Sequence, residues 1–450
     1  MPGILFINGT IVNEGLVYGG GVFVEGDTIA DVWASFDPDA EALEKKYRDL
    51  ASEVVDLTGL HIAPGLIDEH VHFREPGATH KGCIESESAA AVLGGVTSYM
   101  DMPNNNPPAV SEAALLSKEA VAARGSYANY AFYIGATSTN LCQIVGVDPR
   151  RVCGVKVFMG SSTGNLLVDD KASLHRIFAE SQIPVAVHCE DNGIIAGNLE
   201  GFKEVYAYDI PFEAHPFIRS REACIASSSL AIELARETGA HLHITHLSTA
   251  EEVDMVAAAK KAGVKVTAET CVQYLYFDDS AYAEFGPLVK CNPAIKRASD
   301  RRALLDAVRS GVIDTIATDH APHLLEEKQT DYLHSPSGIP LVQFSLLMML
   351  DLVAEGKMKL TSVFECAAHA PACLWKVKSR GFVRKGYKAD LVVFDMKAPS
   401  APSVASRCGW SPVNKFYSSV VHTVVNGTFA VRDGKLCAGR PKVCALEFDR

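Results

Sequence analysis

Two histidines stand one residue apart in the stretch IDEHVHFREPG (67–77), at the end of an apolar run. Side chains of a β-strand repeat every two residues, so His70 and His72 point to the same side if this run is a strand. Two imidazoles on one face can bind one metal ion, although a histidine pair on a strand can equally be structural. The pair therefore defines a candidate metal site that needs ligands from elsewhere in the chain.

Three further polar residues stand directly after apolar runs: His188 closes PVAVH, His246 closes HLHITH, and Asp319 closes DTIATD. Burying polar groups costs free energy unless they are paired, so a repeated placement of this kind indicates a shared site. Together with the first histidine pair, these residues favour a metal centre. His241 and His243 belong to the same strand as His246. We expect both to be packing or supporting residues.

Lys156, in CGVKVFMG, is the candidate for a ligand shared between two ions. Two neighbouring divalent ions each need about four or five ligands, which four histidines and one aspartate do not supply without sharing. A neutral lysine amine that captures CO₂ becomes a carbamate, whose two oxygens can bridge two ions. The alternative is a lysine that extends from the strand end into solvent. The residues alone leave both interpretations open.

The elements that must position these residues alternate between apolar strands and amphipathic helices. Candidate strands lie within residues 60–72, 95–103, 127–137, 153–160, 184–190, 241–248, 264–270 and 314–322, and helical stretches include 172–182, 224–239 and 300–311. Eight strands with helices between them predict an α/β fold, a (β/α)₈ TIM-like barrel over residues 61–384. Active sites of such barrels lie at the C-terminal ends of the strands, where the candidate ligands stand.

Both ends of the chain indicate short strands broken by turns, over residues 1–60 and 385–450. Examples are ILFINGTIV near the start and KADLVVFD, HTVVNGTFAVRDGKL and VCALEF near the end. Two unrelated β pieces are one interpretation. The more economical one, which we predict, is a small β-sandwich domain built from both termini.

Composition narrows the classes of partner. The chain has 450 residues, 48% of them apolar, and a formal net charge of −12. No Lys/Arg cluster is long enough for a nucleic-acid or membrane surface, so we expect neither partner. The 12 cysteines stand singly without a CxxC motif, which indicates reduced thiols. The N-terminus has no basic signal-peptide region and no apolar run spans a bilayer, so we expect a cytoplasmic protein.

The order of candidate ligands resembles the amidohydrolase superfamily, and within it the cyclic-amide hydrolases dihydroorotase, allantoinase and dihydropyrimidinase or hydantoinase. The shared pattern is HxH on the first strand, Lys on the fourth, His on the fifth and sixth, and Asp on the eighth. The resemblance covers nearly the whole chain, because those enzymes also carry a β-domain made from both termini. It implies two zinc ions and, as an assembly, a homodimer. The implied ligands are His70, His72, Lys156 carboxylated by CO₂, His188, His246 and Asp319.

The resemblance also implies the chemistry of these residues. A divalent ion lowers the pKa of bound water from 15.7 to about 7, which makes hydroxide available at neutral pH. Hydroxide would attack a ring amide carbonyl while the ions stabilise the developing oxyanion. Asp319 would take the proton from the nucleophile and pass it to the departing nitrogen, as general base and then general acid. The expected catalytic residue is therefore Asp319.

Four residues bear on the small-molecule substrate. Arg74 stands two residues after His72, and a guanidinium can fork two hydrogen bonds onto a carboxylate, although a surface salt bridge is the alternative for an isolated arginine. Dihydroorotases carry HxHxR here, whereas the allantoinase motif resembles HVHFNEPG. Asn104 in DMPNNNPP and His323 in TDHAPH match carboxylate-binding positions of dihydroorotases, and Asn292 in VKCNPAIK matches a substrate-contacting stretch.

The resemblance thus favours a dihydroorotase, which reversibly cyclises N-carbamoyl-L-aspartate to L-dihydroorotate and water in pyrimidine synthesis. One stretch differs: AETCVQYLYF (268–277) is closer to the allantoinase and hydantoinase version. Lys156 also departs from bacterial dihydroorotases that place an aspartate in this region. An allantoinase or hydantoinase, and a non-catalytic interaction protein of the same family, remain the alternatives. The polar, Gly/Pro-containing segment 324–338 indicates a mobile loop over the mouth or a surface loop.

Overall fold

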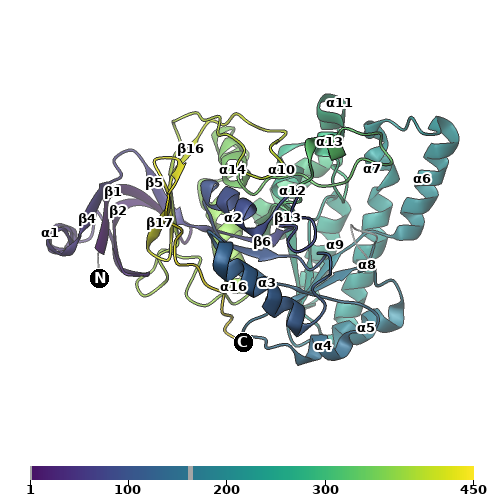
Figure 1. Ribbon diagram of the computed structural model, residues 1–450, viewed down its shortest axis with the longest axis horizontal. Helices are drawn as coiled ribbons and strands as arrows, with labels where there is room; N and C mark the ends of the chain where they lie inside the picture. The colour runs from purple at the N-terminus through teal and green to yellow at the C-terminus, as the bar shows by residue number, and fades with distance from the viewer. Residues whose placement is uncertain (1–2, 161–165) are drawn as a thin grey trace.

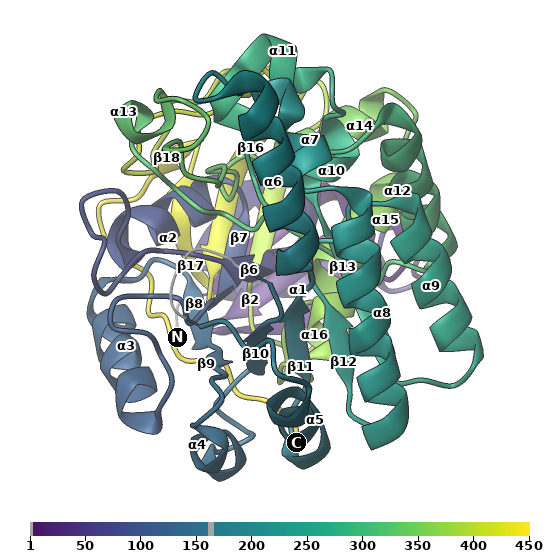
Figure 2. The ribbon, with the colours of Figure 1, turned by 90° about the vertical axis from the view of Figure 1, so that its right-hand side faces the viewer.

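The computed structural model describes residues 3–160 and 166–450, and its larger part is a closed barrel of parallel strands surrounded by helices (Figures 1 and 2). With β8 and β9 counted as two parts of the third strand, the described residues form eight barrel strands. These are β6 (Leu66–Val71), β7 (Val96–Asp101), β8 (Asn129–Phe132) with β9 (Ile134–Gly135), β10 (Val155–Phe158), β11 (Val185–His188), β12 (Leu242–Ile244), β13 (Val266–Cys271) and β14 (Thr315–Ala317). The predicted barrel is confirmed.

The barrel closes between its last and first strands. Val71 forms a parallel bridge with His320, and the His72 N–H donates to the His320 backbone oxygen at 2.8 Å. Every residue of β6 and β7 is buried, as expected for parallel strands covered on both faces. Closure therefore brings the end of β6, with its histidine pair, next to the segment that follows β14.

The helices of the barrel begin and end at residues suited to those positions. Asp191 and Thr249 cap α6 and α9 by accepting the N–H three residues on, while Gly239 and Gly311 end α8 and α12 at φ values of 73° and 76°. The helices are α2 (Ile84–Leu93), α3 (Glu112–Gly125), α4 (Leu141–Gly146), α5 (Lys171–Glu180), α6 (Asn192–Tyr206), α7 (His215–Ile218), α8 (Arg221–Thr238), α9 (Ala250–Lys261), α10 (Val272–Tyr276), α11 (Ala281–Phe285), α12 (Ala298–Ser310), α13 (Leu325–Lys328), α14 (Ser345–Ala354), α15 (Leu360–Phe364) and α16 (Ala370–Leu374). None of the described helices is long and apolar enough to cross a membrane.

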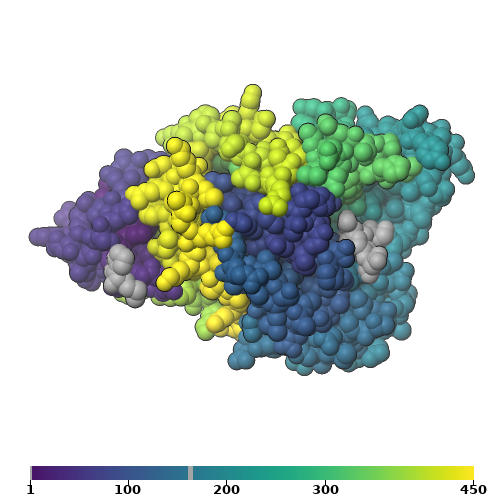
Figure 3. All heavy atoms as spheres, in the orientation of Figure 1, coloured from purple at the N-terminus to yellow at the C-terminus, as the bar shows by residue number. Residues whose placement is uncertain are grey.

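A second sheet is built from both ends of the chain, which lie side by side in Figure 3. Its order is β18-β17-β16-β15-β5-β1-β2-β3, with β4 beside β1. The strands are β1 (Gly3–Asn13), β2 (Leu16–Glu25), β3 (Thr28–Ala34), β4 (Glu53–Asp56), β5 (His61–Pro64), β15 (Leu391–Asp395), β16 (Ser419–Val425), β17 (Thr428–Arg432) and β18 (Lys435–Leu436). Phe6, Val22, Leu391 and Val424 share one core, and α1 (Ala40–Leu50) packs Tyr47 against Phe23. The expected β-domain from both termini is thus present.

The last apolar run, 443–448, differs from our expectation. It does not join this sheet: Ala445 forms a bridge with Tyr130 of β8, and Phe448 forms one with Val377. Its hydrogen bonds therefore tie the C-terminus to the barrel. All twelve cysteines are free, as expected.

Segment 324–338 is attached to the barrel by two buried lysines. Lys328 Nζ donates to three backbone oxygens at 2.9–3.0 Å, and Lys290 Nζ donates to two at 2.6 Å. The acceptors are Lys290, Pro336 and Gly338 for the former, and Tyr332 and Ser335 for the latter. The segment contains the short helix α13 and is held by interior contacts, so it is more than a surface loop.

Candidate metal centre

The first half of the candidate centre is formed by residues at the ends of β6 and β14. Asp319 Oδ1 lies 3.2 Å from His70 Nε2 and 2.9 Å from His72 Nε2. Burial alone would raise the pKa of the Asp319 carboxyl, but the charges of the two imidazoles and the hydrogen bond from His72 outweigh it and hold that pKa well below its usual range. Asp319 is therefore an ionised carboxylate between two imidazole nitrogens.

The second half lies on β11 and just after β12. His188 Nδ1 is 2.9 Å from His246 Nε2, and the two rings pack edge to face with centroids 4.8 Å apart. The His246 ring is also 5.5 Å from that of His70. Four imidazoles, two on β6 and β11 and two just after β6 and β12, thus form a continuous group.

Lys156 on β10 is fully buried, so it does not extend into solvent as the alternative interpretation required. Its Nζ donates to Thr245 Oγ1 at 3.1 Å, beside His246. Burial lowers the pKa of the Lys156 amine to about 8. An appreciable fraction of the amine is then neutral near physiological pH, and the neutral amine is the form that reacts with CO₂.

These donors suit a metal ion. Imidazole nitrogen and carboxylate oxygen are ligands that zinc binds in proteins. One ligand atom from each of His70, His72 and Asp319 lies within 4.8 Å of the others. The donor set thus fits the divalent ions that the resemblance implies.

Three residues of the site have left-handed backbone conformations, which side chains other than glycine adopt at a cost. The φ angles are 67° at Arg74, 44° at His246 and 48° at Asp319. Such conformations cost about 1–3 kcal/mol each and persist where the surrounding structure imposes them. Their concentration at these strand ends indicates that the fold fixes the directions of these side chains.

A small pocket opens beside the first half of the centre. Its lining residues are His72, Arg74, Asn104, Asn292, Asp319, Ala321, Ser337 and Gly338. Three of the four predicted substrate residues therefore face the same space as two candidate metal ligands. Asn292 Oδ1 is buried there without a hydrogen-bond partner among the described residues.

Arg74 is a buried cation without a carboxylate partner in the described part of the chain. It is 8% exposed, its Nε donates to the Pro322 backbone oxygen at 3.0 Å, and its terminal nitrogen lies 2.9 Å from His323 Nε2. Burial lowers the pKa of Arg74 to about 10, so the guanidinium stays charged at neutral pH. This cation is available to an anionic ligand in the pocket.

Two predicted substrate residues have neighbours that the sequence did not suggest. His323 lies behind Arg74 and does not line the pocket, and its Nδ1 is 3.1 Å from Lys81 Nζ. Burial and these two cations keep the pKa of His323 well below its usual value. Asn104 Oδ1 accepts from His72 Nδ1 at 2.7 Å, an arrangement that turns His72 Nε2 toward Asp319.

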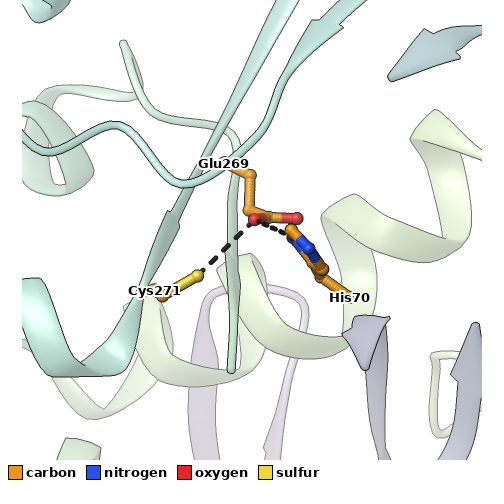
Figure 4. Close-up of side chains that lie close together, drawn as sticks. All are labelled: His70, Glu269 and Cys271. Atoms are coloured by element: carbon orange, nitrogen blue, oxygen red, sulfur yellow. Dashed lines mark hydrogen bonds and ion pairs between the residues drawn. The ribbon is translucent and has the colours of Figure 1, made fainter. Parts of the chain in front are cut away.

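Sequence reasoning missed the carboxylates beneath the centre. Glu269 Oε1 lies 2.8 Å from His70 Nδ1 (Figure 4), and Glu190 Oε2 lies 3.1 Å from His188 Nε2. His243 lies 3.3 Å from Glu69, which fits the supporting role we expected. The available signal was a glutamate inside the predicted strand that contains VTAETC, where burial requires a partner.

Comparisons with known proteins agree with this geometry. The family model described as "Amidohydrolase family" matches residues 61–430. Dihydroorotase of Methanothermobacter thermautotrophicus is 32% identical over 409 residues, covering 89% of this chain and 90% of that protein. An allantoinase of Desulfitobacterium hafniense is 31% identical over 405 residues, covering 86% and 88%. The solved L-hydantoinase (dihydropyrimidinase) of Arthrobacter aurescens has a TM-score of 0.91 at 25% identity, covering 99% and 100%.

The family match spans most of the chain, and the relatives cover nearly all of it. The resemblance stated from the sequence is confirmed, and so is its TIM-like barrel. The chain therefore belongs to the amidohydrolase family and is a hydrolase.

Proposed function

We propose that this hydrolase is a dihydroorotase, which interconverts L-dihydroorotate and N-carbamoyl-L-aspartate. The observation that carries the proposal is Arg74, whose buried charge has no carboxylate partner among the described residues and faces the pocket beside Asp319. A buried charge is costly unless paired, and a substrate carboxylate would pair it. Dihydroorotate carries that carboxylate, whereas hydantoin, dihydrouracil and allantoin do not.

The residues that would hold two zinc ions are His70, His72 and Asp319 on one side and His188 and His246 on the other, with carboxylated Lys156 between them. When bound, such ions ionise a water and polarise the amide carbonyl. Proton transfer and substrate binding are assigned to side chains of the protein.

Asp319 is the residue to which we assign proton transfer. Its Oδ1 is engaged by the two imidazoles, and Oδ2 has no hydrogen bond among the described residues. Oδ2 would take the proton from the attacking water and return it to the ring nitrogen as the carbon–nitrogen bond breaks. The water oxygen becomes part of the new carboxyl group, whose ionisation releases the second proton of the water to solvent, so atoms and charge balance. The reverse sequence takes up that proton, releases water and closes the ring.

Arg74 and the amides of Asn104 and Asn292 would hold the substrate carboxylate at the pocket wall. A cyclic amide without a carboxylate is the second candidate substrate, because the fold is similar to that of an L-hydantoinase and the sequence is 31% identical to that of an allantoinase. Such a ring would leave Arg74 unpaired. Sites built to hydrogen-bond a substrate group reject analogues that lack it by up to about 10⁴–10⁵-fold.

The test is a direct assay of zinc-loaded protein with dihydroorotate, allantoin, hydantoin and dihydrouracil. We expect ring opening of dihydroorotate to exceed that of the other rings by several orders of magnitude in kcat/KM. Turnover of a carboxylate-free ring with none of dihydroorotate would refute the proposal. Metal analysis of the purified protein tests the non-catalytic alternative. A protein that contains no zinc and opens none of the four rings would support that alternative.

A further inference from the structure

We propose that Glu269 is a positioning residue that orients one ligand from each half of the metal centre and so couples the two halves. This inference rests on the proposed metal-dependent function. It concerns a residue of β13, a strand that supplies none of the six candidate ligands.

The contacts of Glu269 converge on one oxygen. Oε1 accepts a hydrogen bond from His70 Nδ1 at 2.8 Å and another from the backbone N–H of His246 at 3.0 Å. Cys271 Sγ lies 3.6 Å from the same oxygen, because residues two apart on a strand share a face (Figure 4). The Glu269 side chain is fully buried, so water does not compete for these contacts.

The first contact fixes the direction of His70. An ionised carboxylate only accepts hydrogen bonds, so Nδ1 of His70 must carry the ring proton. Nε2, which faces Asp319 Oδ1 at 3.2 Å, is then the ring nitrogen left to bind a metal ion. The tautomer that can bind a metal ion is therefore selected by Glu269.

The second contact acts on the other half through the main chain. His246 has φ of 44°, a conformation that needs support from its surroundings. Glu269 supplies it by accepting the His246 N–H, and in this conformation His246 Nε2 faces His188 Nδ1 at 2.9 Å. One carboxylate oxygen thus sets the position of a ligand in each half.

Two neighbouring residues provide matched comparisons. Glu190 contacts His188 Nε2 at 3.1 Å and an arginine, Arg219, so it supports the second half. Cys271 Sγ lies near Glu269 and within 4.8 Å of a His70 ring nitrogen, but it forms no hydrogen bond with a candidate ligand among the described residues. If substitutions in the barrel interior weakened zinc binding in a general way, changes at Glu269, Glu190 and Cys271 would all have the same effect. Coupling by Glu269 instead predicts a different effect on the two zinc sites for each residue.

The experiment is zinc binding to metal-free protein in competition with a chromophoric chelator. Glu269→Gln should weaken both sites, each by about 10–100-fold, which is the usual effect of losing a carboxylate partner of a metal-binding histidine. Glu190→Gln should weaken one site, and Cys271→Ala should leave both unchanged. Thermal unfolding of each metal-free variant, recorded with chelator present, checks that the comparison is made on folded protein.

The outcomes separate this inference from the function it rests on. Wild-type protein that binds no zinc would remove the proposed function. Wild-type protein that binds two ions while Glu269→Gln binds both equally well, or loses only one, would overturn the coupling and leave the function intact. A thiolate-to-metal charge-transfer band in the cobalt-loaded protein that disappears in Cys271→Ala would also overturn it, because the ion would then lie among His70, Glu269 and Cys271.

A second measurement needs no variant. In ¹⁵N-histidine-labelled, zinc-loaded wild-type protein, the His70 ring should carry its proton on Nδ1, the nitrogen that faces Glu269. An unprotonated Nδ1 would contradict the orientation that Glu269 is proposed to impose.

Discussion

Replacing Arg74 by methionine tests the basis of substrate selection. The guanidinium can form two charged hydrogen bonds to a carboxylate, and each is worth about 1.5–3 kcal/mol. Their loss amounts to about 3–6 kcal/mol, or roughly 10²–10⁴-fold in kcat/KM for dihydroorotate. Methionine retains much of the buried volume, so the pocket should keep its shape.

The fold should survive this substitution. Since Arg74 has no ion pair with a carboxylate in the described residues, its removal leaves no buried anion unpaired; it frees only the Pro322 oxygen and His323. Unfolding temperature and zinc content should therefore stay close to wild type. The assay is steady-state ring opening of dihydroorotate, with dihydrouracil as the carboxylate-free comparison.

Two results would refute the reasoning. Full activity of Arg74→Met on dihydroorotate would show that the carboxylate binds elsewhere. An equal proportional loss on dihydrouracil would show that Arg74 acts on the metal centre or the fold instead of on the carboxylate. Arg74→Lys keeps a charge but not the fork, so an intermediate loss is the expected control result.

Three further substitutions test other parts of the site. Asp319→Asn should lower kcat by at least about 10²–10⁴-fold, the usual contribution of a general acid–base, and a variant with wild-type kcat would exclude Asp319 from proton transfer. Lys156→Ala should lose bound zinc, and wild-type protein exposed to ¹³CO₂ should show a carbamate carbon signal that this variant lacks; a signal present in both would place the carbamate elsewhere. Lys328→Met should loosen segment 324–338, seen as faster proteolysis or hydrogen exchange, and unchanged exchange would show that the lysine does not hold it. Burial lowers the pKa of Lys328 to about 7, below the unfolded value of 10.5. The free energy of unfolding of the wild type, relative to Lys328→Met, should therefore rise with pH between about 7 and 10.5. A fall in this free-energy difference over the same range would contradict the expected sign.

The barrel and the proximity of the candidate metal ligands could be predicted because their sequence signals are periodic. The spacing of His70 and His72 places both on one strand face, and each later ligand closes an apolar run. A closed parallel barrel then forces these strand ends together, whatever their separation in sequence. For Lys156 the structure adds that the side chain is buried, which separates the proposed carbamate role from a lysine that reaches solvent.

Other features depend on contacts that no local pattern records. Glu269 is a single glutamate in a strand, and only the closed barrel shows that it faces His70. His323 has the residue type of a carboxylate ligand but lies behind Arg74, because the turn after β14 sets its direction. The anchoring of segment 324–338 by Lys328 and Lys290 was equally hidden, since an isolated lysine normally indicates surface.

The net negative charge of the chain is opposed by positive side chains near the pocket. A net charge of −12 opposes an anionic substrate at long range, but screening limits that repulsion to roughly 8–10 Å at cellular ionic strength. Within that distance the pocket presents Arg74, with Lys81 beyond His323. Under the proposed function, these local cations would attract the substrate carboxylate at short range, where the net charge of the chain is screened.

Two sequence features favour different substrates. The stretch AETCVQYLYF resembles the corresponding stretch of allantoinases and hydantoinases, whereas Arg74 matches the HxHxR motif of dihydroorotases. The structure separates the two signals in space. Glu269, within this stretch, faces the metal ligands, and Gln273 is 1% exposed, whereas the described pocket lining includes no residue of β13 or α10. A sequence feature that supports the metal ligands says little about which ring is bound, since both classes of enzyme need those ligands. Under the proposed function, the residues that would distinguish the substrates are those at the pocket wall. There the guanidinium of Arg74, which has no carboxylate partner among the described residues, favours a ring that carries a carboxylate.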